Sequence, residues 1–256
     1  MRIDSSWAAA SAERATPLDR PQNGIEAVGL RKSFGPVSVL CGVDLQVLPG
    51  ERVLLVGPNG AGKTTLIKIL ATLLRPTAGY ARVAGFDPVR QADMVRRCVG
   101  LVGHQTFLYG ELTVSENLAF YARMYGVEDG DRCRELLSLV GLSDRAGKQA
   151  RTLSRGMQQR LALARVVLHR PPVLLLDEPD ASLDQQGLSV LDGMLQDAAA
   201  SGCAILFTSH DLRRGLDVAS RVAVLSKGRI IFQASREQLD AGDFEEAYRR
   251  HIGAAS

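Results

Sequence analysis

The sequence predicts an α/β fold with a mostly parallel sheet, an N-terminal antiparallel β-subdomain and an inserted helical subdomain. Three observations lead to this prediction. Short, nearly continuous apolar runs alternate with helical patterns in the second half of the chain, as in parallel sheets covered on both faces. A strand-like run meets a glycine-rich turn and then a helix near residue 57. Helical spacing continues from Leu112 to about Leu142 with no strand between.

Length and composition limit the class of protein. The chain has 256 residues, of which 46% are hydrophobic, 23% charged and 5% aromatic, which suits one large globular domain or a domain with a satellite subdomain. The net charge of +3 is too near balance to indicate nucleic-acid binding, so we expect no nucleic-acid partner. The four cysteines are too widely spaced for a zinc or redox pair, and we expect small buried apolar residues at Cys41, Cys98, Cys133 and Cys203.

Residues 1–24 lack a periodic apolar pattern and are rich in Ala, Ser, Pro and charge, so we expect a flexible tail ahead of a domain over 25–256. The first residues include acidic side chains where a secretory signal needs a continuous apolar core. The longest apolar runs fall far short of the roughly 20 residues that a membrane span requires. We therefore expect a cytoplasmic protein.

The first half of the domain reads as a β layer followed by a βα unit. Strand-like runs IEAVGL, VSVL and VDLQV lead to the turn pair Pro49-Gly50, which predicts a small antiparallel layer. The run RVLLV is a buried strand, and a helix over Lys63 to Leu74 follows it. A strand pair is expected around Tyr80 to Val83 and a core strand over 99–103.

The second half predicts alternating helices and strands. A helix is expected from Ser154 to about His169 and another near Leu188 to Ala200, with strands in PPVLLLDEP, CAILFTS, RVAVLS and RIIFQA and a helix in DLRRGLDVA. Basic residues dominate from Arg145 to Arg170, and we interpret them as a solvated helix face rather than an anion site.

The segment after RVLLV fits the phosphate-loop pattern GxxxxGK[ST] in the strand-to-helix context that its mechanism needs, and so predicts a P-loop NTPase core. Glycines allow backbone N–H groups to surround a β-phosphate at the positive end of the following helix. Lys63 would reach the β- and γ-phosphates, and Thr64 would reach Mg²⁺. The candidate nucleotide-binding residues here are Gly57, Pro58, Asn59, Gly60, Ala61, Gly62, Lys63, Thr64 and Thr65.

Two carboxylates end the apolar run Val173 to Leu176. Ligands of open α/β sheets gather at the carboxyl ends of the strands, and buried carboxylates need a reason to be there. Asp177 fits a second Mg²⁺ contact, and Glu178 fits the group that orients or deprotonates the attacking water. Taken alone, this pattern would more often be a strand that ends in an acidic loop, and the upstream phosphate loop favours the catalytic reading.

These motifs occur in a fixed order along about Ile25 to Ala234: GPNGAGKTT, Gln105, LSRGMQQR, LLLDEP, the Ser182–Asp184 triplet and His210. The sequence resembles the nucleotide-binding subunit of an ABC transporter, and the specificity comes from the ordered set. The resemblance implies a helical subdomain over about 104–160 and hydrolysis of ATP with Mg²⁺. It also implies roles for Phe34 in stacking on adenine, Gln105 in contacting Mg²⁺ or water, His210 in contacting the γ-phosphate and Asp184 in communication across a dimer.

The segment 153–158 departs from the family pattern LSGGQ, with Arg155 in place of the first glycine and Met157 in place of the glutamine. The resemblance implies that Ser154 and the N–H of Gly156 grip the γ-phosphate bound to the opposite subunit, at the start of a helix. In the alternative reading Ser154 is only a helix N-cap. An exposed Arg155 is compatible with either role if its backbone keeps a negative φ.

The resemblance further implies two partners: a second ATP-binding subunit, with a homodimer expected, and an integral membrane permease that places the chain on the inner face of the plasma membrane. The stretch Leu101 to Gly126 resembles the ATPase subunit of heme exporters in cytochrome c maturation. Its residues Phe107 to Tyr109 form an apolar cluster that either packs in the core or lines a groove for a helix of the permease. The rival functions are a soluble ABC-type ATPase in DNA repair or translation and a nonhydrolytic regulatory module. The short separation of Gln105 and Ser154 disfavours the first, and the presence of both Glu178 and His210 disfavours the second.

Overall fold

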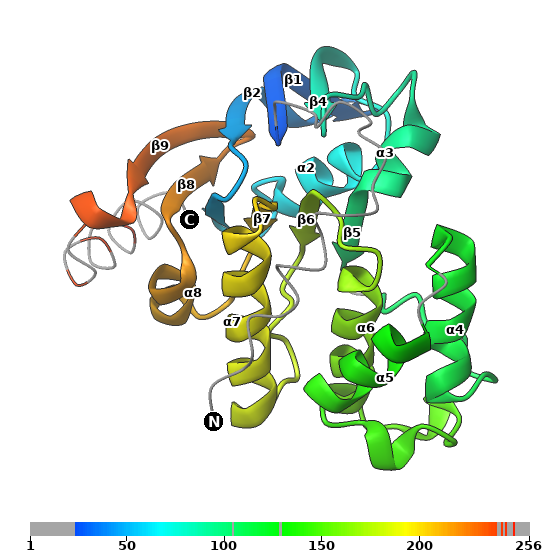
Figure 1. Cartoon of the computed structure of the whole chain (residues 1–256). Coiled ribbons are helices and arrows are strands. Elements are labelled where there is room, and N and C mark those ends of the chain that lie inside the picture. Colours follow the sequence, from blue (N-terminus) through cyan, green and yellow to red (C-terminus); the bar gives the residue numbers. More distant parts are fainter. Residues whose placement is uncertain are drawn as a thin grey trace.

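A computed structural model describes residues 24–103, 105–127 and 130–239, together with Gly242, Phe244 and Tyr248. A small antiparallel sheet lies above a six-stranded sheet, and helices cover the opposite face of the larger sheet (Figure 1). This is the expected α/β architecture. The expected tail over 1–24 lies outside the described residues except for Gly24.

The small sheet has the strand order β2-β1-β4 and is antiparallel throughout, with β1 (Ile25–Phe34), β2 (Val37–Val47) and β4 (Ala78–Val83). The runs VSVL and VDLQV, expected as separate strands, form the single strand β2. Gly42 divides them at a register shift, where its φ of 104° suits glycine because no Cβ is present. The strand pair expected around Tyr80 is the single strand β4, which pairs with β1.

The large sheet has the order β5-β6-β7-β3-β8-β9 and is parallel except for the edge strand β9. A tight turn at Lys227 and Gly228, both at positive φ, joins β8 to β9. Gly228 also accepts a hydrogen bond from the Cys41 N–H at 2.8 Å, which ties the two sheets together. The strands are β3 (Arg52–Val56), β5 (Val99–Val102), β6 (Val173–Leu176), β7 (Ala204–Phe207), β8 (Arg221–Ser226) and β9 (Arg229–Ser235).

Alternate residues of β3 point into two separate cores. Leu54 and Val56 belong to the core beneath the helices, whereas Val53 and Leu55 belong to the core between the sheets. All four are buried, which is why RVLLV is continuously apolar instead of alternating. Because both faces of β3 pack in a core, the strand fixes the start of the loop that follows it.

Apart from α3, the helices lie where the apolar spacing predicts them, most within shorter bounds and α7 within longer ones. They are α2 (Lys63–Leu70), α3 (Ala92–Cys98), α4 (Val114–Tyr125), α5 (Gly130–Leu139), α6 (Arg155–Val167), α7 (Gln185–Ala200) and α8 (Leu212–Val218). Short 3₁₀ turns occupy Ser143–Arg145, Ala150–Thr152 and Arg236–Gln238. The helix expected to reach Leu74 ends at Leu70, because Thr72 turns to positive φ. The sequence analysis missed the seven-residue α3.

The basic run from Arg145 to Arg170 is not a solvated face throughout, and that prediction is wrong for two of its members. Arg160 and Arg165 are buried. Arg165 donates to the carbonyl of Leu101 at 2.7 Å, and its guanidinium lies 5.1 Å from the centroid of the Tyr121 ring and 5.7 Å from that of Phe107. The buried cation is thus held by π faces and a carbonyl.

The cysteine prediction is correct for one of the four positions. Cys203 is buried, and its burial raises the pKa of the thiol to about 12. Cys41, Cys98 and Cys133 are only partly buried, and all four thiols are free. Cys98 and Cys133 pack against the margins of the two core clusters, and Cys41 lies within β2.

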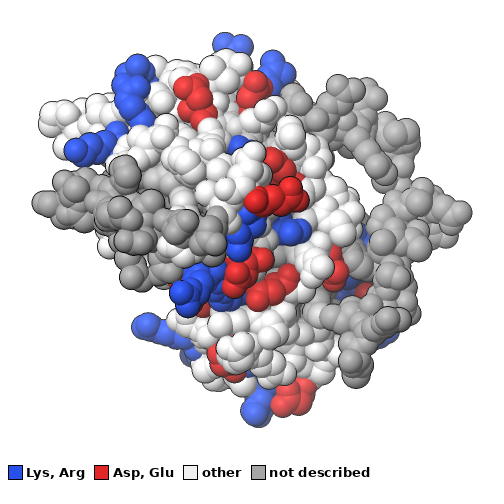
Figure 2. Space-filling view, turned by 90° about the vertical axis from the view of Figure 1, so that its left-hand side faces the viewer, with Lys and Arg blue, Asp and Glu red and all other residues white. Residues whose placement is uncertain are grey.

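The surface over β8, β9 and α8 carries interspersed charges. Figure 2 shows blue and red side chains side by side on this face, without a broad field of one sign over the described residues. Ion pairs also tie these elements to their neighbours: Arg221 on β8 pairs with Glu51, and Arg214 on α8 pairs with Asp180 and Asp192. The distribution agrees with the near-balanced charge of the sequence.

A single buried amide holds the segment that leads into α4. Asn117 is fully buried; its Oδ1 accepts from the Tyr109 N–H at 2.8 Å, and its Nδ2 lies within 3.2 Å of the carbonyl oxygens of Tyr109, Leu112 and Thr113. The hydroxyl of Tyr121 donates to the carbonyl of Phe107 one turn further along α4. These bonds fix the segment 107–113 against the helix.

Asn117→Ala is expected to lower the free energy of unfolding by about 2 to 3 kcal/mol, because it leaves a buried N–H and buried carbonyls without partners. Urea unfolding of the full chain measures the loss. Ser189→Ala, at an exposed position on α7, is the control and should stay within about 0.5 kcal/mol of the parent chain. An equal loss in both variants would contradict the role assigned to Asn117.

Candidate active site

The loop 57–62 leaves β3 and enters α2 at a point where only small residues fit. A Cβ on Gly57 would lie 2.1 Å from the carbonyl oxygen of Leu225 on β8. Gly62, the N-cap of α2, has a φ of 107°, and a Cβ there would lie 2.6 Å from Leu40. Gly57 is therefore required by the close backbone of β8, and Gly62 by its positive φ and the Leu40 side chain of β2.

Lys63, Thr64 and Thr65 form the first turn of α2, where backbone N–H groups have no partner within the helix. The Lys63 ammonium donates to the carbonyls of Gly57 at 2.6 Å and Pro58 at 3.2 Å. Burial lowers the pKa of Lys63, and the carboxylates of Glu178 and Asp177 oppose that effect. The cation thus lies inside its own loop and close to both carboxylates. At the tip of the loop Asn59 and Gly60 are exposed, whereas Ala61 is buried.

The two carboxylates after β6 are held by a hydroxyl at the end of β7. Thr208 is fully buried; its Oγ1 donates to Asp177 Oδ1 at 2.9 Å and accepts from the Glu178 N–H at 2.8 Å. Glu178 has a φ of 55°, the left-handed region that non-glycine residues seldom adopt. The backbone at Glu178 is strained so that its side chain turns away from the strand direction, as strained residues at functional sites often do.

His210 lies next to Glu178, although 31 residues separate them in the sequence. Its Nε2 is 2.7 Å from Glu178 Oε2. The imidazole is mostly exposed, whereas the carboxylate is mostly buried. The structure therefore brings together the acid that follows β6, the histidine that follows β7 and the lysine that follows β3, three strands adjacent in the sheet.

The start of α6 lies against the segment that leads into α7. Ser154 caps α6, with its side chain accepting from the Met157 N–H at 3.3 Å. A Cβ on Gly156 would lie 2.7 Å from the carbonyl of Ser182, a residue at positive φ. Asp184 caps α7 by accepting from the Gly187 N–H at 2.8 Å. The N-cap reading of Ser154 is thus realised in this chain, and an exposed hydroxyl can serve both as cap and as ligand.

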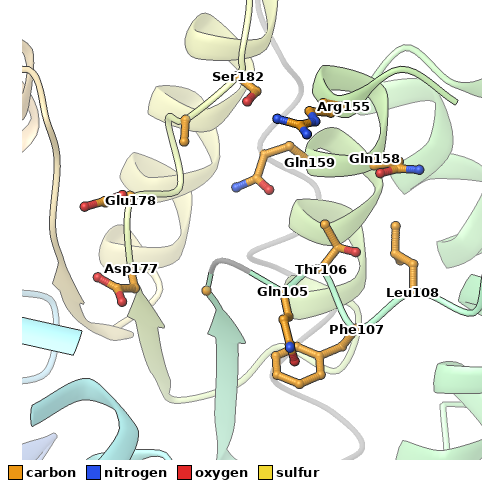
Figure 3. A pocket seen from close by; sticks show the side chains of 12 residues that line it. Gln105, Thr106, Phe107, Leu108, Arg155, Gln158, Gln159, Asp177, Glu178 and Ser182 are labelled. Carbon is orange, nitrogen blue, oxygen red and sulfur yellow. The ribbon is translucent and has the colours of Figure 1, made fainter. Parts of the chain in front are cut away.

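A pocket of about 730 Å³ separates the two carboxylates from α6 (Figure 3). Asp177 and Glu178 lie on one side, and Arg155 and Gln159 extend toward them from α6. The lining residues are Gly103, Gln105, Thr106, Phe107, Leu108, Arg155, Gln158, Gln159, Asp177, Glu178, Ala181 and Ser182. Gln105 and Glu178 thus line the same pocket.

Phe34 lies at the end of β1, at the tip of the antiparallel sheet. Its side chain is 48% exposed, and the Lys32 ammonium lies 4.9 Å from the ring centroid. An exposed ring with one face open can stack on a planar ligand, which core packing would prevent.

Two buried polar residues of the site are not predicted from the sequence. Thr208 lies in the strand-like run CAILFTS, and the usable signal is a hydroxyl directly after a buried apolar run and two residues before His210. Gln159 is buried on α6, and its Nε2 donates to the carbonyl of Pro179 at 3.0 Å. Thr208 links Asp177 to β7, and Gln159 links the loop after Glu178 to α6.

Neither a membrane span nor an all-protein metal cage is present in the described parts of the chain. No helix there is long and apolar enough to cross a bilayer. No group of three or more His, Cys, Asp or Glu side chains there could hold a metal ion. A cation at this site would therefore depend on few carboxylates together with hydroxyl, amide and phosphate oxygens, the mixture that Mg²⁺ accepts.

The chain matches the family model described as "ABC transporter" over residues 40–181. It is 37% identical over 231 residues to the daunorubicin resistance ATP-binding protein DrrA3 of Streptomyces coeruleorubidus, covering 88% of this chain and 73% of that protein. It is 36% identical to the glutamine transport ATP-binding protein GlnQ of Escherichia coli, covering 80% and 89%.

Solved structures of ATP-binding cassettes have the same fold. One, the structure of an ATP-binding subunit of an ABC transporter, superposes with a TM-score of 0.79 at 28% identity, over 88% of this chain and 94% of that one. A second, a dimeric post-hydrolysis state of the cassette MJ0796 bound to ADP and Pi, has a TM-score of 0.76 at 26% identity, over 84% and 100%. With the motif geometry described above, these matches show that the chain belongs to the ABC transporter family, as an ATP-binding and ATP-hydrolysing subunit.

Proposed function

We propose that two copies of this chain form a dimer on the inner face of the plasma membrane and hydrolyse MgATP to drive a membrane permease. The observation that carries the proposal is the convergence of Lys63, Asp177, Glu178 and His210 at one edge of the sheet. Binding of ATP closes the pair, and hydrolysis reopens it. The division into a tail over 1–24, a domain over 25–256 and a helical subdomain over about 104–160 belongs to the same proposal.

In this mechanism the chain contributes mainly positioning and charge. Phosphate oxygens replace the loop carbonyls as acceptors for the Lys63 ammonium, which neutralises charge on the transferring group. Glu178 orients the attacking water and accepts its proton. His210, in contact with Glu178, reaches the γ-phosphate, and Phe34 stacks on the adenine.

Thr64, Asp177 and Gln105 are the residues proposed to hold Mg²⁺. Thr64 lies in the first turn of α2, Asp177 is buried beside Lys63, and Gln105 lines the pocket. When bound, the cation supplies charge neutralisation at the β- and γ-phosphates. The fit is chemical: the three side chains offer one hydroxyl, one carboxylate and one amide oxygen, the hard oxygen donors that Mg²⁺ prefers.

The second subunit completes each site in this proposal. The exposed Ser154 hydroxyl and the N–H of Gly156, at the positive end of the 13-residue α6, would contact the γ-phosphate held by the opposite phosphate loop. Asp184, at the cap of α7, would communicate across the pair. The neighbour MJ0796 is dimeric in its post-hydrolysis state, which supports the pairing of two cassettes.

The surface for the permease is proposed to be Phe107, Leu108, Tyr109, Phe120 and Met124. Phe107 is 40% exposed, Tyr109 48% and Met124 56%, so core packing does not cover these side chains. Tyr109 packs edge-on against Phe120 with centroids 4.7 Å apart, which forms an open aromatic wall. A short helix of the permease would bind here, next to the segment that carries Gln105.

The relatives carry names from drug resistance, Nod factor export and glutamine transport. Export of a small apolar or amphipathic molecule is the broader proposal, and heme export in cytochrome c biogenesis is the finer one, carried by the segment 101–126. Neighbouring genes for cytochrome c maturation would support heme export, whereas a lone permease gene would not. The rival function, a soluble ATPase of DNA repair or translation, is disfavoured because the 49 positions between Gln105 and Ser154 leave no room for a long coiled-coil insert.

Glu178→Gln is expected to bind ATP but hydrolyse it at least about 10²-fold more slowly, the usual effect of losing a general base. Phosphate release under MgATP measures turnover. Size-exclusion chromatography with MgATP should then show a trapped dimer. A monomer alone, or near-normal phosphate release, would be inconsistent with the proposed role.

Arg155→Gly is expected to leave turnover nearly unchanged, whereas Ser154→Ala should lose most of it, because only Ser154 is proposed as a phosphate ligand. The Ser154 variant also loses its N-cap, which costs about 1 kcal/mol. Thermal melts of both variants separate that loss from the catalytic one. If Arg155→Gly is as damaging to turnover as Ser154→Ala, the arginine is itself a phosphate ligand.

Tyr109→Glu is expected to leave the isolated chain folded, with ordinary ATP binding, but to abolish co-purification with its permease. Ile231→Glu, which charges an exposed apolar position on β9, is the matched control and should co-purify normally. A large fall in melting temperature of the isolated Tyr109 variant would show that this ring belongs to the core, and would refute the proposed docking surface.

A further inference from the structure

The residue before His210 fixes the turn that carries it. The Ser209 hydroxyl donates to Asp180 Oδ2 at 2.5 Å and accepts from the Asp211 N–H at 3.1 Å. Its single hydrogen goes to the charged carboxylate, the strongest acceptor within reach. The Ser209 hydroxyl therefore bridges the turn that carries His210, by its bond to Asp211, and anchors that turn to Asp180 in the loop after Glu178.

Asp180 is itself held in place by an arginine of α8. Its side chain is 9% exposed, and its Oδ2 also accepts from Arg214 Nη1 at 3.3 Å. Arg214 Nη2 contacts Asp192 and lies 3.4 Å from the carbonyl of Leu188, both on α7. Because two helices restrain the arginine, the carboxylate of Asp180 is a rigid acceptor for the hydroxyl of Ser209.

We infer that Ser209 and Asp180 are positioning residues that keep the His210 imidazole against Glu178. The inference rests on the roles proposed above for His210 and Glu178. Glu178 and Asp180 belong to one loop after β6, and Ser209 and His210 to one loop after β7. A contact between Ser209 and Asp180 therefore fixes one loop relative to the other at a position adjacent to the pair of His210 and Glu178, whose atoms are 2.7 Å apart.

The network offers a control that distinguishes positioning from simple stability. Asp180 and Asp192 both pair with Arg214, but the hydroxyl contact to Ser209 is made by Asp180. Burial raises the pKa of Asp192, and Arg214 opposes that shift. Replacing either aspartate weakens the hold on Arg214, whereas replacing Asp180 also removes the charged acceptor beside His210.

The experiment measures kcat and KM for MgATP in the full-length chain and its variants. Ser209→Ala should lower kcat about 10-fold with KM within about twofold, since a small displacement of a reacting group costs rate more than binding. Asp180→Asn should do the same. Ser209→Thr keeps the hydroxyl and should restore most of the rate, and Asp192→Asn should keep kcat within about twofold of the parent chain.

A double-mutant cycle with His210→Ala completes the test. If Ser209 acts through His210, adding Ser209→Ala to His210→Ala should cause no further loss of kcat, because residues that act as a unit are not additive. Additive losses, or an unchanged kcat in Ser209→Ala, would overturn this inference while leaving the proposed function intact. An unchanged kcat in His210→Ala itself would overturn the proposed role of His210 and this inference together.

Discussion

The parallel register of β6 with β7 is the constraint on which the site depends. Leu176 pairs with Phe207, so the residues that follow them, Asp177 and Thr208, meet at the same height of the sheet. A shift by one residue would turn every side chain beyond the strand to the opposite face and separate these polar partners. The strands are fully buried and apolar on both faces, so the same packing that stabilises the sheet also specifies the geometry of the catalytic groups.

Three further contacts restrain the loop that follows β6. The strain at Glu178 is opposed by the hydrogen bond from its N–H to Thr208 and by the pairing of its carboxylate with His210. On the other side of the pocket, Gln159 connects α6 to the carbonyl of Pro179. The loop between β6 and α7 is therefore restrained by β7 on one side and by α6 on the other. Displacement of either element would move the carboxylates of this loop.

Much of this arrangement could be predicted from the sequence, because the signals are local. The phosphate loop is predictable because the backbone requires glycine at Gly57 and Gly62. Strand β3 is predictable because its apolar run is unbroken. Burial of Arg160 and Arg165 could not be predicted, since their partners lie on strands, loops and helices distant in the sequence. The joining of VSVL and VDLQV was missed because a bulge at Gly42 interrupts the alternation without ending the strand. Family resemblance supplied the roles of Gln105 and His210, which periodicity alone would leave as ordinary polar residues.

The manner in which Arg165 is held has a consequence for the join between the sheet and the helical insert. Its partners are the rings of Phe107 and Tyr121 and the carbonyl of Leu101, groups that carry no proton to gain in mild acid. A carboxylate partner would be neutralised as the solution is acidified, and an exposed ion pair would be screened by salt. The guanidinium beside these aromatic rings responds to neither in mild acid, because burial and Arg165 itself lower the pKa of the neighbouring His169 to about 4, so that imidazole stays neutral. This join is therefore insulated from ionic conditions that would loosen the exposed charge pairs on the rest of the surface.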